Sequence, residues 1–386
     1  MRLKKGDNME YLKKYNSWLD NDYFDESTRT ELANLKDNEE EIKERFYKDL
    51  DFGTAGLRGV LGAGSNRMNL YTVRKATQGV ANYIIKKNGQ DRGVAIAYDS
   101  RRMSPEFANE TALCLNANGI KAYVFESLRP VPELSFTLRE LGCIAGVVIT
   151  ASHNPPEYNG YKVYWEDGAQ ITAPIDEEII AEVNAVEDYA AVKTIDIKTA
   201  KEQGLYIAIG KEMDDKYIEA VKKCSINPVS ETGKSLKIVY TPLHGSGITL
   251  VPRLLEELGF ENVYIVPEQE KPDPSFPTVA YPNPEDPAVY DLALKLAKEV
   301  DADVILATDP DADRIGIMAR NNDGGYEIFN GNMIGALIVE YILSQRKEKG
   351  TLPTNGAVLK TIVSTNMVDK IAQAYDAKVF EVLTGF

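Results

Sequence analysis

The chain contains the stretch Ile144-Ala-Gly-Val-Val-Ile-Thr-Ala-Ser-His-Asn-Pro-Pro-Glu-Tyr-Asn-Gly-Tyr-Lys162, which begins as a short apolar run. Residues 144–149 are rich in β-branched side chains and bounded by Gly and Pro, which predicts a buried strand. The run leads through Thr150 to Ser152, so a single hydroxyl group follows the end of the strand. Open α/β sheets carry their chemistry at the carboxyl ends of strands, and Ser152 is therefore the first candidate nucleophile.

The same segment has a simpler interpretation. His153 follows the candidate serine directly, and Lys162 closes the stretch. Ser, Asn and Pro all favour turns, so Ser-His-Asn-Pro could be only a polar turn between two strands. This stretch alone leaves both interpretations open, and a second group of residues elsewhere in the chain has to distinguish them.

The composition indicates an ordinary globular protein and excludes some classes of partner. The chain has 386 residues, of which 44% are hydrophobic and 27% charged, and this length favours two or three domains. The formal net charge of −15 argues against nucleic acid or an anionic membrane surface as a partner. Any phosphate site must therefore depend on a local cluster of basic groups.

Cysteine usage and the lack of long apolar runs indicate the compartment. Cys114, Cys143 and Cys224 lie far apart without metal-like spacing, which favours free thiols in a reducing environment. The N-terminus lacks an apolar run of signal-peptide length, and no later run is long enough to span a bilayer. We therefore expect a cytoplasmic protein that binds neither nucleic acid nor a membrane.

The first part of the chain predicts a helical cover followed by a glycine-rich segment. Residues 9–50 have apolar side chains at helical spacing among many charges, which predicts helices that cover the following domain. In Asp51-Phe-Gly-Thr-Ala-Gly-Leu-Arg-Gly59, glycines surround Arg58, and a backbone of this kind can approach an anion closely. The alternative is a flexible surface loop.

Strands and helices then alternate with short connections. We expect strands at 93–98, 121–125, 144–149 and 158–165, and helices at 72–87, 104–118, 132–141 and 176–186. Ser104 and Pro105 predict a helix that has the serine as N-cap and the proline as its first residue. This alternation predicts a parallel or mixed sheet that helices cover on both faces.

A charged, irregular stretch at 187–201 predicts a boundary, after which the alternation resumes. The expected strands of the next part are 236–240, 263–266 and 303–308, with a helix at 248–258 that ends at Gly259. The proline-rich residues 267–287 are expected to be a surface connection without helix. The predicted fold class is α/β, with successive related αβ domains at 1–203, 204–322 and 323–386, the third incomplete.

Three acidic residues alternate after the strand expected at 303–308. Asp309, Asp311 and Asp313 offer hard oxygen ligands in a short loop, which suits Mg²⁺. An EF-hand loop is excluded because its sixth and twelfth positions, Gly and Glu, are Arg314 and Arg320 here. A phosphoaspartyl hydrolase also matches poorly, because its pattern has Thr or Val at the fifth position, where this chain has Asp313. A solvated acidic turn is disfavoured because three crowded carboxylates without a cation would repel one another.

A serine at one strand end and a Mg²⁺ loop at another fit phosphoryl transfer through a phosphoserine. In such chemistry the metal neutralises phosphate oxygens, and arginine and lysine side chains hold the sugar phosphate. The chain's only two histidines, His153 and His244, both lie in candidate site loops, which supports a functional setting without assigning them a proton-transfer role.

These residues resemble the α-D-phosphohexomutase family. Its phosphoserine loop is similar to Thr150-Ala-Ser-His-Asn-Pro155, and its metal loop to Asp309-Pro-Asp-Ala-Asp-Arg314. The other similar segments are Phe52-Gly-Thr-Ala-Gly-Leu-Arg-Gly59, Asn159-Gly-Tyr-Lys162, Tyr98-Asp-Ser-Arg101, Thr241-Pro-Leu-His-Gly245 and Pro282-Asn-Pro-Glu285. The last three resemble the phosphoglucomutase/phosphomannomutase branch that includes phosphopentomutase-like members, and the resemblance runs from about residue 47 to 386.

The resemblance implies a four-domain fold and a role for individual residues. The first three domains would be related αβ units, Ser152 would carry the phosphate, and the three aspartates would bind Mg²⁺ together with it. Arg58 and Lys162 match positions near the transferring phosphate, Lys162 as candidate general acid and base. The remaining candidates are His153 among the catalytic residues and Thr54, Asn154 and Arg314, with Arg58 and Lys162, among the substrate-binding residues.

The implied activity is interconversion of glucose 1-phosphate and glucose 6-phosphate through a bisphosphate intermediate, with a sugar 1,6-bisphosphate as activator. The alternatives are a phosphomannomutase, a phosphopentomutase or sugar-bisphosphate synthase, a non-catalytic phosphosugar-binding fragment, and a phosphatase. Val131 stands where most members of the branch have Thr. The family's sugar-recognition loop and fourth domain would lie beyond Phe386, so we expect a truncated chain that is itself poorly active and whose preferred sugar the sequence does not reveal.

Overall fold

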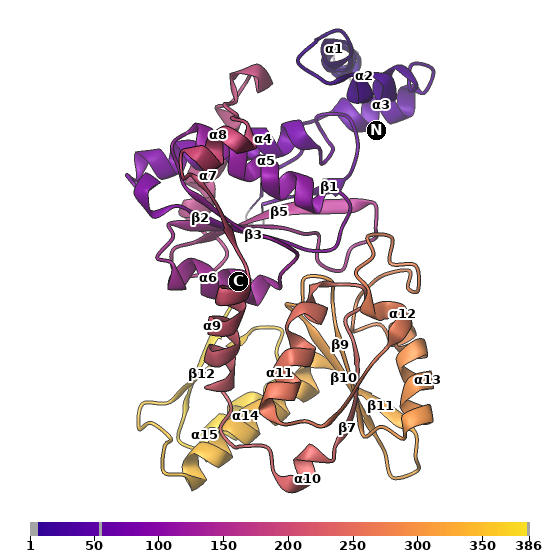
Figure 1. Cartoon of the computed structure of the whole chain (residues 1–386), viewed down its shortest axis with the longest axis vertical. Coiled ribbons are helices and arrows are strands. Elements are labelled where there is room, and N and C mark those ends of the chain that lie inside the picture. The colour runs from indigo at the N-terminus through magenta and orange to yellow at the C-terminus, as the bar shows by residue number, and fades with distance from the viewer. Residues whose placement is uncertain (1–6, 54–55, 384–386) are drawn as a thin grey trace. The chain divides into compact units, whose positions relative to one another are not determined.

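The computed structural model describes residues 7–53 and 56–383 (Figure 1). Contacts between residues divide the chain into two compact units, which are described separately below. The first unit comprises Met1–Met213 with Asp273–Ser275, and the second comprises Asp214–Pro272 with Phe276–Phe386. Helix α9 (Lys211–Lys222) carries the chain from the first unit into the second.

The first unit is built on a six-stranded mixed sheet with the order β1-β5-β4-β2-β3-β6. Its strands are β1 (Leu57–Val60), β2 (Val94–Tyr98), β3 (Ala122–Phe125), β4 (Ala145–Ile149), β5 (Tyr158–Trp165) and β6 (Tyr206–Ile209). Strands β4, β2, β3 and β6 run parallel, whereas β5 is antiparallel to both β4 and β1. The mixed sheet confirms the predicted α/β class.

Helices cover both faces of this sheet, as the alternating pattern predicts. They are α4 (Leu70–Lys86), α5 (Ser104–Ala117), α6 (Val131–Glu140), α7 (Ile175–Asn184) and α8 (Ile197–Glu202), with 3-10 turns η1 (Gln90–Arg92) and η2 (Tyr189–Ala191). On one face, apolar residues of α4, α5 and α7 pack against Ile96, Val147 and Tyr161. On the other, α6 packs against Val148 and Tyr164. Neighbouring strand residues thus face opposite cores.

The predicted helical cover is present as α1 (Asp7–Leu19), α2 (Glu26–Ala33) and α3 (Glu39–Phe46). Aromatic side chains hold it together: the Trp18 ring stacks on Phe24 with centroids 4.1 Å apart and meets Tyr71 of α4 edge-on at 5.6 Å. Stacked and edge-on rings of this kind add stability beyond their buried area. The three helices therefore pack on α4 through a small aromatic core of their own.

The second unit contains a five-stranded sheet with the order β11-β10-β9-β7-β8 and a separate parallel pair, β12 and β13. Its strands are β7 (Lys237–Thr241), β8 (Asn262–Ile265), β9 (Val304–Thr308), β10 (Ile315–Arg320), β11 (Tyr326–Phe329), β12 (Ala357–Thr361) and β13 (Lys378–Val382). Its helices are α10 (Glu231–Lys234), α11 (Val251–Leu258), α12 (Pro267–Glu270), α13 (Asp291–Val300), α14 (Gly331–Glu348) and α15 (Met367–Ala374), with 3-10 turns η3 (Ser246–Thr249) and η4 (Pro287–Tyr290).

The two larger sheets share one arrangement of strands. In the first, β4 has a parallel neighbour, β2, on one side and the antiparallel β5 on the other. In the second, β9 has the parallel neighbour β7 and the antiparallel β10. The predicted repetition of αβ architecture is therefore visible in strand order, and the loops β4–β5 and β9–β10 occupy corresponding positions.

Several local predictions were wrong. Ser104 is not the N-cap of α5 but its first residue; the N-cap position is Met103, with φ 64°, and it makes no side-chain cap bond. The Ser104 hydroxyl instead donates to Asp99 Oδ1 at 2.9 Å. The proline-rich residues 267–287 include one turn of helix, α12, which begins at Pro267. Proline is tolerated there because the first helical N–H needs no partner within the helix.

Other elements were not predicted at all. Strand β1 overlaps the end of the glycine-rich segment, β6 follows residue 203 and pairs with β3, and β10 and β11 form a hairpin after the acidic loop. In the part of the chain that the structure describes, no helix is long and apolar enough to cross a membrane.

Candidate active site

The loop between β4 and β5 presents Ser152 at the carboxyl end of a buried strand, as the sequence predicts. Its side chain is mostly buried, and its backbone adopts φ 54°, which is uncommon for a residue other than glycine. The hydroxyl oxygen lies 3.1 Å from Nδ1 of the partly buried His153. The Ser152 N–H donates to Thr150 Oγ1 at 2.8 Å, so the conformation of this residue is held on its N-terminal side.

A buried ion pair within the Tyr98-Asp-Ser-Arg101 segment, to which the sequence assigned no individual role, lies beneath this loop. The side chains of Arg101 and Asp99 are fully buried, with Arg101 Nε 3.2 Å from Asp99 Oδ2. The guanidinium donates to four loop carbonyls: Ser152 O at 2.7 Å, Asn154 O at 2.6 Å, Pro155 O at 2.8 Å and Tyr158 O at 3.1 Å. The available signal was a charged segment directly after the strand that parallels β4.

Strand register positions Lys162 and Arg58 near this loop. On β5, Lys162 lies opposite Val148 of β4, and its side chain is largely buried. Arg58 of β1 lies opposite Gly160, is exposed, and has Nη1 at 3.5 Å from Asn154 Oδ1. The structure therefore brings Arg58 and Asn154 together, while Thr54 lies outside the described residues.

Gly160 allows this close pairing of strand and loop. A side-chain carbon at this position would lie 2.4 Å from Thr150 O and 2.9 Å from Leu57 O. Both are backbone atoms that cannot move aside without disrupting β1 or the loop, so only glycine fits. The glycine of the Asn159-Gly-Tyr-Lys162 motif thus has a packing role beside Ser152.

The second candidate loop gathers the three predicted carboxylates. One ligand oxygen each from Asp309, Asp311 and Asp313 lies within 4.8 Å of the others. Asp309 and Asp311 are fully buried, and Asp313 is partly buried. Buried carboxylates at this separation need compensating positive charge, and three hard oxygen donors are the ligands that Mg²⁺ prefers. The residues present therefore fit a divalent cation.

Neutral groups and close packing hold the backbone of this acidic loop. The N–H and the hydroxyl of Ser246 both donate to Pro310 O, at 2.8 and 2.9 Å. A side-chain carbon on Gly245 would lie 2.4 Å from Pro310 Cα, so glycine is required where the two loops meet. At the end of β9, Thr308 Oγ1 lies 2.8 Å from the Tyr240 hydroxyl, whose pKa burial raises.

Two further predicted residues lie in the second unit. The Arg314 N–H donates to Asp309 Oδ1 at 3.1 Å, while its exposed guanidinium lies 3.7 Å from Glu285. His244 is buried, with Nδ1 3.1 Å from Lys271 O and Nε2 2.9 Å from Thr278 Oγ1. Its ring therefore connects two segments of the second unit.

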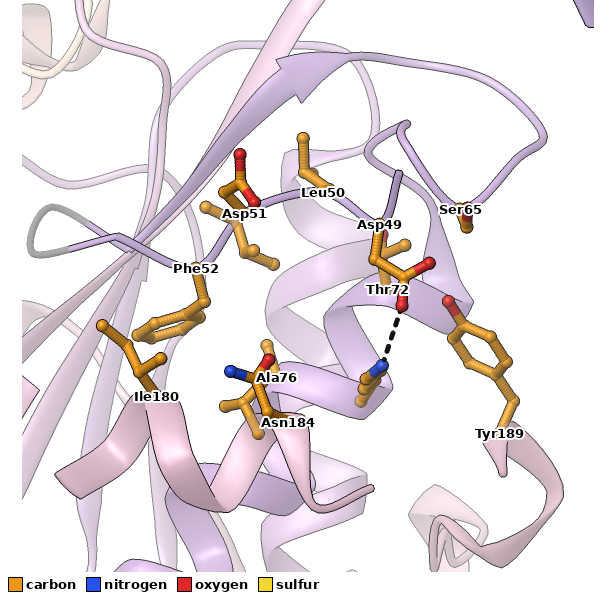
Figure 2. Close-up of a pocket in the computed structure, with 13 residues that line it drawn as sticks. Asp49, Leu50, Asp51, Phe52, Ser65, Thr72, Ala76, Ile180, Asn184 and Tyr189 are labelled. Atoms are coloured by element: carbon orange, nitrogen blue, oxygen red, sulfur yellow. Dashed lines mark hydrogen bonds and ion pairs between the residues drawn. The ribbon is translucent and has the colours of Figure 1, made fainter. Parts of the chain in front are cut away.

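A cavity of about 160 Å³ in the first unit is separate from these loops (Figure 2). Asp49, Asp51 and Lys75 line it, and Lys75 Nζ is paired with Asp49 Oδ2 at 3.2 Å. Figure 2 shows Phe52 at one end and Tyr189 near the paired groups. The glycine-rich segment therefore contributes to this cavity through Asp51, Phe52 and Leu57, whereas its arginine, Arg58, is not among the lining residues.

The fold and the two loops define an α/β protein built from repeated units, with a hydroxyl loop in one unit and a carboxylate loop in the next. Three family models match the chain: phosphoglucomutase/phosphomannomutase alpha/beta/alpha domain I at residues 49–190, domain II at 215–324 and domain III at 330–386. The chain therefore belongs to the phosphoglucomutase/phosphomannomutase family, which confirms the α-D-phosphohexomutase resemblance.

Individual relatives agree with this assignment. The chain is 38% identical over 371 residues to a phosphoglucomutase of Staphylococcus epidermidis, covering 96% of this chain and 66% of the relative. It is 39% identical over 348 residues to one of Staphylococcus aureus, covering 90% and 61%. The chain thus spans 61% to 66% of the length of these curated relatives.

The fold also matches a solved structure. A phosphoglucomutase/phosphomannomutase family protein from Burkholderia thailandensis aligns with a TM-score of 0.67 at 23% identity, covering 86% of this chain and 66% of that protein. At this level of identity the likeness concerns the fold alone, and it agrees with the mixed sheets described above.

Proposed function

We propose that the chain carries the phosphoryl-transfer residues of a phosphohexomutase that interconverts glucose 1-phosphate and glucose 6-phosphate. The observation that carries the proposal is the pair of corresponding strand-end loops, one with Ser152 and one with three carboxylates that fit a divalent cation. The names of the related staphylococcal enzymes favour glucose phosphates as substrates.

The proposed reaction begins with phosphorylated Ser152. The C6 hydroxyl of glucose 1-phosphate attacks the phosphorus, the bond from phosphorus to Ser152 Oγ breaks, and glucose 1,6-bisphosphate forms. Lys162 accepts the proton of the attacking hydroxyl. The bisphosphate turns over in the site and returns its C1 phosphate to Ser152, which releases glucose 6-phosphate. Free sugar 1,6-bisphosphate activates the enzyme by loading Ser152.

The other candidate residues bind and orient the substrate. Arg58 and Asn154, which contact each other, would hold phosphate oxygens together with Thr54 and Arg314. The hydrogen bond between His153 and the Ser152 hydroxyl would orient that hydroxyl. Asp309, Asp311 and Asp313 would hold Mg²⁺ with an oxygen at Ser152, and the ion would neutralise charge on the transferring phosphate.

The proposal includes the setting that the sequence predicts. The enzyme would be cytoplasmic, with a small sugar phosphate as its partner. The acidic net charge of −15 and the three separate cysteines support a soluble enzyme in a reducing compartment.

Phosphorylation of Ser152 tests the proposal most directly. The chain is incubated with glucose 1,6-bisphosphate and Mg²⁺, and we expect its intact mass to rise by about 80 Da, one phosphoryl group. Ser152→Ala should abolish this gain because it removes the acceptor oxygen, whereas Ser135→Ala, at a serine of α6, should retain it. An unchanged gain in Ser152→Ala would exclude Ser152 as the phosphate carrier.

Parallel assays separate the related activities. The protein is given glucose, mannose and ribose 1-phosphates with Mg²⁺ and a bisphosphate primer. Isomerisation of glucose 1-phosphate supports the proposal. Isomerisation of mannose or ribose phosphate alone would mean that this sugar phosphate, and not glucose 1-phosphate, is the substrate. Phosphorylated Ser152 without isomerisation favours a bisphosphate synthase or a binding role, and release of free phosphate without isomerised sugar indicates a phosphatase.

A further inference from the structure

We propose that Arg101 is a positioning residue for phosphoryl transfer: its buried guanidinium fixes the backbone of the Ser152 loop so that the serine hydroxyl is held in reactive geometry. This inference rests on the proposed function and assigns a role to a residue outside the set predicted from the sequence. Arg101 is only 1% exposed, so it acts through the loop rather than by touching substrate.

The guanidinium has five N–H donors in a rigid plane, and the loop uses four of them. Nη2 donates to the carbonyls of Ser152 and Asn154, and Nη1 to those of Pro155 and Tyr158. The fifth donor, on Nε, faces Asp99. One side chain thereby gathers the carbonyls of the whole connection from β4 to β5 around a single centre.

Asp99 extends this network to the other side of Ser152. Its Oδ2 accepts the Thr150 hydroxyl at 2.7 Å, and Thr150 Oγ1 in turn accepts the Ser152 N–H at 2.8 Å. Its Oδ1 accepts the Arg101 N–H at 3.0 Å. Both peptide groups that flank the Ser152 side chain are therefore held, the N–H through Thr150 and the carbonyl through Arg101.

The backbone of Ser152 explains why such holding is needed. Its φ of 54° lies in the left-handed region, which costs a residue with a side chain about 1–3 kcal/mol. Such a conformation persists only where the surroundings fix it, and here hydrogen bonds on both sides of the residue do so.

The buried Arg101–Asp99 pair is not explained by a contribution to stability alone. A buried ion pair contributes little net stability, because desolvation of the two charges offsets their attraction. All four carbonyl partners of the guanidinium lie in the loop or at the first residue of β5. The buried charge therefore acts on one short segment, which is the segment that carries the candidate nucleophile.

The rate at which Ser152 takes up phosphate from glucose 1,6-bisphosphate tests this inference in the full chain. We expect Arg101→Ala to lower the rate about 100-fold, the size of effect that a displacement of about 1 Å produces. Arg101→Lys should lower it by at least about 10-fold, because a single ammonium cannot reach four carbonyls. Arg102→Met, at the exposed neighbouring arginine, is the matched control and should retain the wild-type rate.

Chemical rescue distinguishes positioning from a general loss of structure. Guanidinium ion at millimolar concentration should restore part of the rate to Arg101→Ala and leave Arg102→Met unchanged. Melting temperatures are measured for each variant. If neither Arg101 variant folds, Thr150→Val decides, since it removes only the hydroxyl that holds the Ser152 N–H and should slow phosphorylation about 10-fold.

The outcomes separate the two proposals. Phosphate on wild-type Ser152, slow uptake in the Arg101 variants and rescue by guanidinium support the positioning role. Folded Arg101 variants that are phosphorylated at the wild-type rate, or a Thr150→Val variant that is unaffected where the Arg101 variants do not fold, overturn it while leaving the proposed function intact. No phosphate on the wild-type chain overturns the proposed function and this inference with it.

Discussion

The loops after β4 and β9 occupy corresponding positions in their sheets, yet different groups hold their backbones. A charged guanidinium, Arg101, gathers carbonyls of the Ser152 loop. In the acidic loop the Pro310 carbonyl instead accepts two bonds from Ser246, a neutral residue. The two loops therefore occupy the same position in their sheets, but a charged side chain binds the backbone of one and a neutral residue binds the Pro310 carbonyl of the other.

The difference follows from what each loop presents. The Ser152 hydroxyl is neutral, and the positive charge of Arg101 is balanced by Asp99 at 3.2 Å, so the network leaves the serine without excess charge. A positively charged side chain fixed beneath Asp309 and Asp311 would instead pair with these carboxylates, which a metal ion needs as ligands. Ser246 holds the Pro310 backbone of the acidic loop without placing a positive charge there.

The largest effect is expected from a substitution of one of the candidate metal ligands in the acidic loop. Asp309→Asn removes one negative charge from the three-carboxylate cluster and should weaken Mg²⁺ binding by at least about 100-fold, measured by titration calorimetry. Asp323→Asn, at an exposed aspartate after β10, is the matched control. Equal Mg²⁺ affinity in the two variants would mean that these carboxylates do not form a metal site.

A smaller effect is expected from breaking the packing that holds the same loop. Gly245→Ala places a carbon 2.4 Å from Pro310 Cα, so the loop must shift. We expect the free energy of unfolding to fall by about 1–3 kcal/mol, measured by urea denaturation. Mg²⁺ affinity should fall about 10-fold, since the ligands move with the backbone.

The control for this change is Gly335→Ala in α14. Among the described residues, no heavy atom outside the local helix backbone lies within 4 Å of the added carbon there, and alanine is the better helix former by about 1 kcal/mol. It should leave Mg²⁺ binding unchanged and raise stability slightly. A Gly245→Ala variant that behaves like this control would refute the packing argument.

The smallest expected effect is a change in how the stability of the second unit depends on pH, through the buried hydroxyl of Tyr240. Burial raises the pKa of Tyr240 above its ordinary value of 10.0, so the folded chain retains this proton where the unfolded chain loses it. Its contribution to stability is present below pH 10 and declines as the pH rises above that value. Tyr240→Phe should reduce the loss of stability by up to about 1.4 kcal/mol per pH unit.

Urea denaturation at pH 9 and pH 11 measures this slope, with Tyr281→Phe, at an exposed tyrosine, as the control. Identical slopes in wild type and Tyr240→Phe would show that this hydroxyl does not titrate through unfolding. A reduced slope would confirm that the end of β9 depends on a neutral hydroxyl pair, Tyr240 and Thr308.

The sequence predicted the strands and loops that carry the candidate chemistry because these features are local. An apolar run followed by Ser152, or by alternating aspartates, is visible within a dozen residues. The segment with Asp99 and Arg101 was noted only for its family resemblance, because the role of the two side chains depends on β2 lying beside β4, and strand order is not encoded in periodicity. Ser104 was misassigned as a cap for the same reason, since its hydroxyl bonds to Asp99.

The β10–β11 hairpin was missed although a local signal existed. The segment Asn321-Asn-Asp-Gly-Gly325 joins the two strands and has the composition of a hairpin turn. The sequence interpretation placed a unit boundary there instead. Strand β1 was missed because its four residues, at the end of a glycine-rich segment, pair with β5 through tertiary context rather than intrinsic propensity.

The Ser152 loop should behave as an extension of the sheet rather than as a mobile connection. The amides of Thr150, Ser152 and Asn154 all donate within the loop or to β5, and two prolines contribute no N–H. Hydrogen exchange at these three amides should therefore be slow, on the scale of the neighbouring strands rather than of surface turns. Under the proposed function, a loop ordered in advance would lose little conformational entropy when phosphate binds, so more of the binding free energy would remain for the transition state.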